Sequence, residues 1–271
     1  MSESPPAVPP EFPCAWQILC EDGPVLAINK PAGLLTLGAH DPAIPTLERQ
    51  VRSFLKEKYQ KPGNVYLGIP HRLDRPVSGV ILFAKNSKAA GRLAEQFRER
   101  RVRKIYWGIT THRPEQPEGC LSDWLLKEPD KAHVHVVPPE TPGARQAVLH
   151  YRIAGPTPLG TLLEIEIETG RMHQIRVQLA SRGWHILGDV QYGAQQLLID
   201  PAPADPTLNP IALHARQITF FHPVRYDAVT ITAPLPENWG DLQLELPAET
   251  LPFARQTPSL PAGDDDDEGP F

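Results

Sequence analysis

The chain has 271 residues, 41% hydrophobic and 22% charged, a balance that suits a globular protein with an ample core. No run of about 18 apolar residues is present, which excludes a membrane-spanning helix. Three cysteines without a CxxC pair argue against a disulfide framework or a zinc site. The net charge of −5 includes −2 from the N-terminal leader and −4 from the tail, so the body carries +1 and could still bind phosphates through a local basic patch.

Both ends of the chain differ in composition from the middle. Residues 1–13 are Pro-rich and residues 251–271 are acidic, and both segments are predicted to be disordered. Residues 14–250 contain no long linker or internal repeat and are expected to form one domain. The leader lacks the basic and apolar regions of a signal peptide, and the sparse cysteines fit reduced thiols, so a cytoplasmic protein is expected.

Short strands and amphipathic helices alternate in the first half of the chain. A strand at Val25–Ile28 precedes a helix over residues 46–60, which has Thr46 as a favourable N-cap. A buried strand at Val80–Ala84 leads to a helix over residues 87–100, whose apolar residues recur at i, i+3, i+4 and i+7.

Strands dominate the second half. In the segment 162–168, Leu163, Ile165 and Ile167 alternate with glutamates, which predicts a half-buried antiparallel strand. Because strands outnumber helices and arrive in runs, the predicted class is α+β, with a mixed, largely antiparallel central sheet flanked by helices and loops. The other predicted elements are strands at 104–110, 147–153, 211–220 and 229–232, and a short helix at 171–181 closed by Gly183.

Asp74 is the first candidate for chemistry. It lies in the segment His71-Arg72-Leu73-Asp74, shortly before the apolar run 80–84. A carboxylate held by a tight turn just before a strand can act as a nucleophile or general base. A structural turn Asp is the commoner use of this residue, and on this segment alone it is the favoured interpretation.

Arg176 changes that balance. On the predicted helix 171–181 it falls on or beside the apolar face that includes Ile175. A guanidinium keeps its proton and needs a carboxylate, carbonyl or phosphate, unless its head reaches water while its stem packs. A buried partner such as Asp74 would form a bidentate pair, which would hold the carboxylate ionised and aimed.

Tyr106 and a nearby basic run suggest a nucleic-acid ligand. On strand 104–110, Tyr106 is either a core aromatic, the commoner case, or a stacking platform for a nucleobase. The basic run 98–104 favours the platform, although cations also stabilise the C-terminal end of a helix. His71, His173, His185 and His214 are candidate metal ligands, but none of the four lies in an HxH, HExxH or His/Cys cluster, and no metal site is predicted. No glycine-rich nucleotide loop is present, so no nucleotide cofactor is predicted either.

Several separate motifs, in order, make the chain resemble the RluA-type pseudouridine synthases, which isomerise uridine to pseudouridine in RNA. The resemblance covers about residues 16–236, and HRLD together with GRxHQIR is highly specific. The motifs are INKPAGL at 28–34, HRLD at 71–74 with SG at 78–79, KIY at 104–106, TGR and HQIR within 169–176, LGD and YG within 187–193, and LHA and FHP within 213–223.

The resemblance implies a role for each matched residue. Asp74 would be the catalytic residue, either as a nucleophile or as a base that helps to generate a glycal. Tyr106 would stack on the flipped base, and Arg176 would pair with Asp74. Arg72 would occupy the space that the extruded nucleotide leaves in the RNA, and Leu213 would line the base pocket. Further RNA contacts are expected from His71, Arg171, Arg101, Arg103 and Lys104.

The resemblance also implies a cofactor-free enzyme that acts on structured tRNA or rRNA. Residues 14–250 would be a monomeric catalytic domain without the N-terminal RNA-binding domain that some members carry. Val77 stands where the family commonly has Thr, and Gln178 where many members have His. The alternatives are a non-catalytic RNA-binding or chaperone protein, and a hydrolase with an Asp nucleophile; the latter lacks a second carboxylate at a matching motif.

Overall fold

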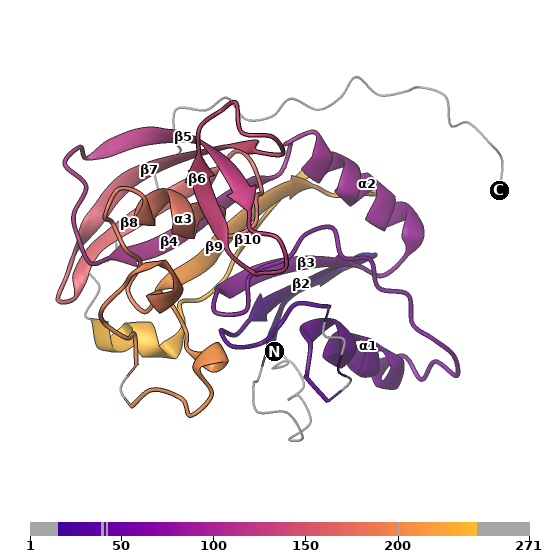
Figure 1. The fold of residues 1–271 in the computed structure, drawn as a ribbon. Coiled ribbons are helices and arrows are strands. Elements are labelled where there is room, and N and C mark those ends of the chain that lie inside the picture. Colours follow the sequence, from indigo (N-terminus) through magenta and orange to yellow (C-terminus); the bar gives the residue numbers. More distant parts are fainter. Residues whose placement is uncertain (1–15, 39–40, 42, 200, 243–271) are drawn as a thin grey trace.

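The structure, a computed structural model, describes residues 16–38, 41, 43–199 and 201–242 (Figure 1). The leader and acidic tail predicted to be disordered lie outside the described residues, as do residues 14–15 and 243–250 of the predicted domain. Among the described residues, no helix is long and apolar enough to cross a membrane.

Ten strands of the described chain form one sheet, in the order β1-β2-β3-β9-β4-β8-β7-β5-β6, with β10 paired to β9. All neighbouring strands are antiparallel except β3 and β9, which confirms the predicted mixed, largely antiparallel sheet. The strands are β1 (Gln17–Asp22), β2 (Val25–Lys30), β3 (Ser78–Ala84), β4 (Arg103–Thr110), β5 (Glu118–Lys127), β6 (Val134–Val137), β7 (Arg145–Thr157), β8 (Gly160–Ile167), β9 (Leu213–Phe221) and β10 (Ala228–Thr232).

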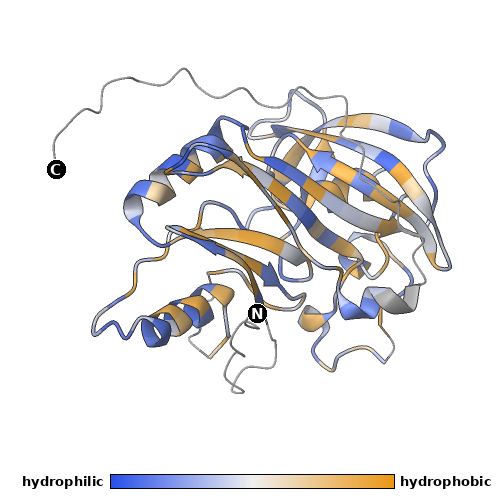
Figure 2. Cartoon of the chain, turned by 180° about the vertical axis from the view of Figure 1, so that it is seen from behind, coloured by the Kyte–Doolittle hydropathy of each residue, from blue (hydrophilic) through white to orange (hydrophobic). Residues whose placement is uncertain are grey.

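Three α-helices accompany the sheet in the described chain: α1 (Leu47–Lys58), α2 (Ser87–Arg98) and α3 (Gln174–Ala180). As predicted, Thr46 caps α1, and its side chain accepts a hydrogen bond from the backbone N–H of Arg49. Figure 1 shows α1 beside β2 and β3, whereas α3 lies near β5 and β6. Strands β2 and β3 are mostly hydrophobic, whereas α1 and α2 carry many hydrophilic residues (Figure 2). Short 3₁₀ turns lie at Val190–Tyr192, Pro206–Leu208 and Glu237–Leu242.

Strand β8 is antiparallel, but the prediction that it is half-buried is wrong. Glu164 and Glu166 are only 1% and 2% exposed. The carboxylate of Glu164 accepts hydrogen bonds from Trp107 Nε1 and Arg152 Nη2, and Glu166 pairs with Arg103. The alternating sequence therefore predicts correctly that the glutamates point to one face of the strand. That face is not exposed to solvent, because the partners of the glutamates bury it.

The short parallel contact between β3 and β9 positions the site. Ser78 pairs with His214, so the turn that precedes β3 lies beside the start of β9. A Cβ on Gly79 would lie 2.3 Å from the carbonyl oxygen of Ala215, so only glycine permits this approach. Since β4 pairs with the other edge of β9, Tyr106 comes opposite Ala215.

Candidate active site

A pocket of 670 Å³ lies where the turn before β3, α2, β4, the start of β9 and the segment leading into α3 meet. Its volume is within the ~300–1,000 Å³ typical of small-ligand sites. Eight residues predicted from the sequence line it: His71, Arg72, Asp74, Lys104, Tyr106, Arg171, Arg176 and Leu213.

Hydrogen bonds to the backbone on both sides of Asp74 hold its turn in place. The hydroxyl of Thr36 donates to the carbonyl of Leu73 at 2.8 Å. The ammonium of Lys30, which is completely buried, donates to the carbonyl of Arg75 at 3.2 Å. A buried ammonium needs such acceptors, so the INKPAG loop and the Asp74 turn are coupled. The same ammonium also donates to the carbonyls of Pro31 and Leu34.

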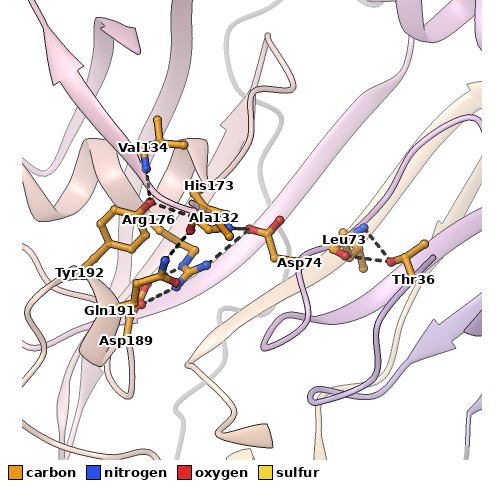
Figure 3. A network of polar contacts seen from close by, with 10 residues as sticks. All are labelled: Thr36, Leu73, Asp74, Ala132, Val134, His173, Arg176, Asp189, Gln191 and Tyr192. Carbon is orange, nitrogen blue, oxygen red and sulfur yellow. Dashed lines mark hydrogen bonds and ion pairs between the residues drawn. The ribbon is translucent and has the colours of Figure 1, made fainter. Parts of the chain in front are cut away.

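Arg176 has a different main partner from the one predicted. Its Nε and Nη2 donate to the two carboxylate oxygens of Asp189, each at 2.7 Å, and Nη2 also donates to Gln191 (Figure 3). The ion pair with Asp74 is longer, with Nη1 at 3.8 Å from Oδ2. The predicted contact between Arg176 and Asp74 is present, but the expectation that it is bidentate is wrong, because Asp189 occupies the fork of the guanidinium.

The charge of Arg176 is secured despite its burial. The residue is only 3% exposed. Burial alone would lower its pKa, but the hydrogen bonds and charge of Asp189 outweigh burial, and the pKa of Arg176 is raised. A permanent cation therefore lies beside the carboxylate of Asp74.

His173 is a site residue that the sequence reasoning missed. Its Nε2 lies 3.9 Å from Asp74 Oδ2, and its Nδ1 is 2.8 Å from the hydroxyl of Tyr192. Burial lowers the pKa of His173, although the charge of Asp74 acts in the opposite direction. The residue lies inside the GRxHQIR motif, but it was considered only as a metal ligand. The helix was predicted to begin at residue 171. Because His173 adopts a left-handed φ of 51°, α3 begins at Gln174 instead.

Tyr106 and Leu213 provide apolar surfaces next to Asp74. Both residues lie on adjacent strands and line the pocket, and Tyr106 is 9% exposed. Burial raises the pKa of Tyr106, and the charge of Asp74 raises it further, so the ring stays a neutral phenol. An aromatic face and an aliphatic side chain can hold a flat heterocycle between them.

Cations gather along one wall of the pocket. Arg98, Arg100, Lys104 and Arg171 all line it. Burial lowers the pKa of Arg171, and the neighbouring charges of Arg145 and Arg100 lower it further. Like charges in one wall repel each other unless an anion is bound, so this wall is suited to phosphates.

Arg101 and Arg103 do not line this pocket, although they were expected to contact RNA together with Lys104. Successive residues of β4 point to opposite faces of the sheet, so Lys104 and Tyr106 face the pocket while Arg103 pairs with Glu166 on the other side. Arg101 pairs with Glu99, its Nε 2.7 Å from the carboxylate.

His71 lines the pocket but is held by the fold. Its Nε2 accepts a hydrogen bond from the backbone N–H of Leu82 at 2.9 Å, and its ring stacks on Phe97 at 4.7 Å. Burial, assisted by the charge of Lys104, lowers the pKa of His71 to about 3. The imidazole is therefore neutral at physiological pH and offers no positive charge to a phosphate. No group of three or more His, Cys, Asp or Glu able to hold a metal ion occurs among the described residues.

Comparison with known proteins agrees with this geometry. A family model described as RNA pseudouridylate synthase matches residues 24–181. An uncharacterized RNA pseudouridine synthase of Synechocystis is 33% identical over 230 residues, which cover 84% of this chain and 68% of that protein. Ribosomal large subunit pseudouridine synthase D of Zymomonas mobilis is 31% identical over 229 residues, 84% of this chain and 71% of its own.

A solved structure has the same fold. The human protein RNA pseudouridylate synthase domain containing 4 superposes with a TM-score of 0.68 and is 28% identical, covering 85% of this chain and 94% of that one. The pocket and its surrounding motifs lie mostly within the matched segments. The chain therefore belongs to the RluA-type RNA pseudouridine synthase family, and it is an RNA-modifying isomerase.

Proposed function

We propose that the enzyme isomerises one uridine that is flipped out of a structured RNA into the 670 Å³ pocket, with Asp74 as the catalytic residue. The observation that carries the proposal is the setting of Asp74. Its carboxylate is 24% exposed within the pocket and lies 3.8 Å from the buried guanidinium of Arg176. Tyr106 and Leu213 supply the surfaces on which a uracil ring would rest.

The reaction needs a pocket that retains a detached base. The C1′–N1 bond breaks, uracil turns, a C1′–C5 bond forms, and C5 then loses its proton. Asp74 would act either as the nucleophile at C1′ or as a base that helps to generate a glycal. Escape of the free uracil would leave an abasic site, so its contacts with Tyr106 and Leu213 must persist while the bond is broken.

Flipping a uridine out of paired RNA costs a few kcal/mol of unstacking. Arg72 is exposed at the rim and makes no hydrogen bond or ion pair with any residue that the structure describes. Its guanidinium is therefore available to occupy the position that the flipped uridine leaves in the RNA helix. The cationic wall formed by Arg98, Arg100, Lys104 and Arg171 would bind the flanking phosphates.

The substrate is proposed to be structured rRNA or tRNA. Large-subunit rRNA is the first to test, since relatives in Zymomonas mobilis and Buchnera aphidicola are named as ribosomal large subunit pseudouridine synthases. We further propose that the enzyme is a cytoplasmic monomer. The free thiols of Cys20 and Cys120 support a reducing compartment.

The test is conversion of uridine in total RNA from cells that lack the protein. RNA labelled with tritium at C5 of uridine releases the label when C5 becomes bonded to C1′, and position mapping identifies the target. Asp74→Asn keeps the size of the side chain and removes its charge, so it should abolish release. Asp227→Asn is the matched control, because Asp227 is 52% exposed and pairs with Arg225 outside the pocket. Retained activity in Asp74→Asn would contradict the role of Asp74 and favour the non-catalytic alternative for this residue.

A further inference from the structure

The side chains of Arg176 and His173 approach the same oxygen of the Asp74 carboxylate. Arg176 Nη1 lies 3.8 Å and His173 Nε2 lies 3.9 Å from the same atom, Oδ2 (Figure 3). Oδ1 makes no hydrogen bond with any described residue. The two oxygens are therefore chemically distinct before a substrate binds.

The hydrogen bonds around Tyr192 determine which nitrogen of His173 carries the proton. The hydroxyl of Tyr192 accepts from the backbone N–H of Val134 at 3.1 Å and lies 2.8 Å from His173 Nδ1. A hydroxyl has one proton to donate, and in this buried position Nδ1 is the acceptor beside it. A neutral imidazole that accepts at Nδ1 carries its proton on Nε2, the atom that faces Asp74.

The opposite tautomer would be unfavourable on both sides of the ring. An Nδ1–H group would leave the proton of the Tyr192 hydroxyl without this acceptor, and the lone pair of Nε2 would face a carboxylate. The charged and titratable groups around His173 are Asp74, Arg176, Asp189 and His133. Arg176 already supplies the positive charge, so a neutral donor adds a hydrogen bond without a second buried cation.

Ring contacts fix the orientation of the imidazole. His173 meets the ring of Tyr192 edge to face, with centroids 5.6 Å apart. Tyr192 is itself held between His133, stacked at 4.8 Å, and the guanidinium of Arg176 at 4.9 Å. A side chain held on this many sides is suited to orient another group.

We propose that His173 is a positioning residue, a neutral Nε2–H donor oriented by Tyr192 that holds Oδ2 of Asp74 together with Arg176 and leaves Oδ1 as the reacting oxygen. The inference deepens the proposed function and rests on the catalytic role of Asp74. Both contacts to Oδ2 exceed a hydrogen-bond length by about 1 Å. Catalytic hydrogen bonds are often long without substrate and shorten in the complex, so both contacts close when RNA fills the pocket.

Two substitutions of His173 separate this role from a purely structural one. In His173→Gln the side-chain amide reaches the Nε2 position and keeps a donor for Asp74. In His173→Asn the shorter amide can still bond Tyr192 but does not reach Asp74. Asn also tolerates the left-handed φ of 51° better than Gln, so a structural role predicts that Asn is the better replacement.

The assay is single-turnover tritium release by the full-length chain, with thermal melting to confirm folding. We expect His173→Gln to keep the rate within about fivefold and His173→Asn to lose roughly 10–100-fold in the chemical step, with little change in KM. The reverse order, equal activity of the three proteins, or an equal loss in both variants would overturn the proposal.

Nitrogen-15 NMR of the histidine side chains supplies a readout that does not depend on activity. The wild-type protein should show His173 protonated at Nε2 and not at Nδ1 near neutral pH, and Tyr192→Phe should weaken that preference. An Nδ1–H tautomer or an imidazolium in the wild type would refute the assignment. A wrong assignment of the His173 proton can be distinguished from a wrong proposed function, because the Asp74→Asn assay tests the function by itself.

Discussion

The ion pair between Arg176 and Asp189 is expected to contribute far more to the free energy of unfolding than the contact between Arg176 and Asp74. The side chains of Arg176 and Asp189 are 3% and 2% exposed and are joined by two hydrogen bonds of 2.7 Å. Arg176→Met would leave the carboxylate of Asp189 buried without its partner, at a cost of about 3–5 kcal/mol. That is a large share of a typical total of roughly 5–15 kcal/mol.

The corresponding loss at Asp74 should be small. Its side chain is 24% exposed, and the guanidinium is 3.8 Å away, so Asp74→Asn should cost less than about 1 kcal/mol while abolishing activity. Arg176→Met, in contrast, should lower the melting temperature by roughly 6–20 °C, since about 2–4 °C is lost per kcal/mol in a chain of this size class.

Urea denaturation with a double-mutant cycle measures both contacts directly. We expect a coupling energy of about 2–3 kcal/mol between Arg176 and Asp189, and less than about 0.5 kcal/mol between Arg176 and Asp74. Asp227→Asn again serves as the control for an exposed carboxylate. A stronger coupling of Arg176 to Asp74, or an Arg176→Met protein as stable as the wild type, would show that Asp189 is not the main partner.

Two further predictions follow from the sheet and from a buried histidine. Lys104→Met should weaken RNA binding and reduce the steepness of the plot of log binding constant against log salt concentration by about 1. Arg103→Met, on the opposite face of the strand, should leave that slope unchanged. Binding titrations at several salt concentrations measure both slopes. His71 has a pKa lowered from 6.5 to about 3 in the folded protein, so the unfolded chain binds its proton first as the pH falls. Its contribution to stability is complete above about pH 6.5 and is lost progressively toward pH 3, and His71→Gln should flatten the dependence of the unfolding free energy on pH in this window by up to about 1.4 kcal/mol per pH unit. An unchanged pH dependence in His71→Gln would show that folding does not lower the pKa of His71.

The elements that the sequence predicted correctly are those whose pattern is local. Thr46 caps α1 because its hydroxyl accepts a hydrogen bond from the backbone N–H of Arg49, and the apolar run at 80–84 becomes a fully buried strand. Strands β1, β5 and β6 were not predicted. Their exposure is irregular or their length is short, so no regular alternation distinguished them from loops, and pairing with neighbours made them strands.

Through the family that its motifs resemble, the sequence also predicted eight of the residues that line the pocket. The family resemblance implied that Asp74, Tyr106 and Leu213 belong to one site, and all three line the pocket. Successive residues of a strand point to opposite faces, and this period separates Lys104 from Arg103. Both residues were expected to contact RNA, and for Arg103, which lies outside the pocket, that contact stays a prediction.

Only the tertiary structure decided how the polar groups of the site are partnered. A buried guanidinium requires a carboxylate, and the sequence supplies both Asp74 and Asp189; through-space geometry gives the bidentate contact to Asp189 and a single longer contact to Asp74. The proton position on His173 likewise depends on Tyr192, which is 19 residues away in the chain. Residue type determines which hydrogen-bond or ion-pair partner a buried side chain requires, and the local period determines the direction in which it points. Which residue becomes that partner depends on chain segments that come together only when the sheet is assembled.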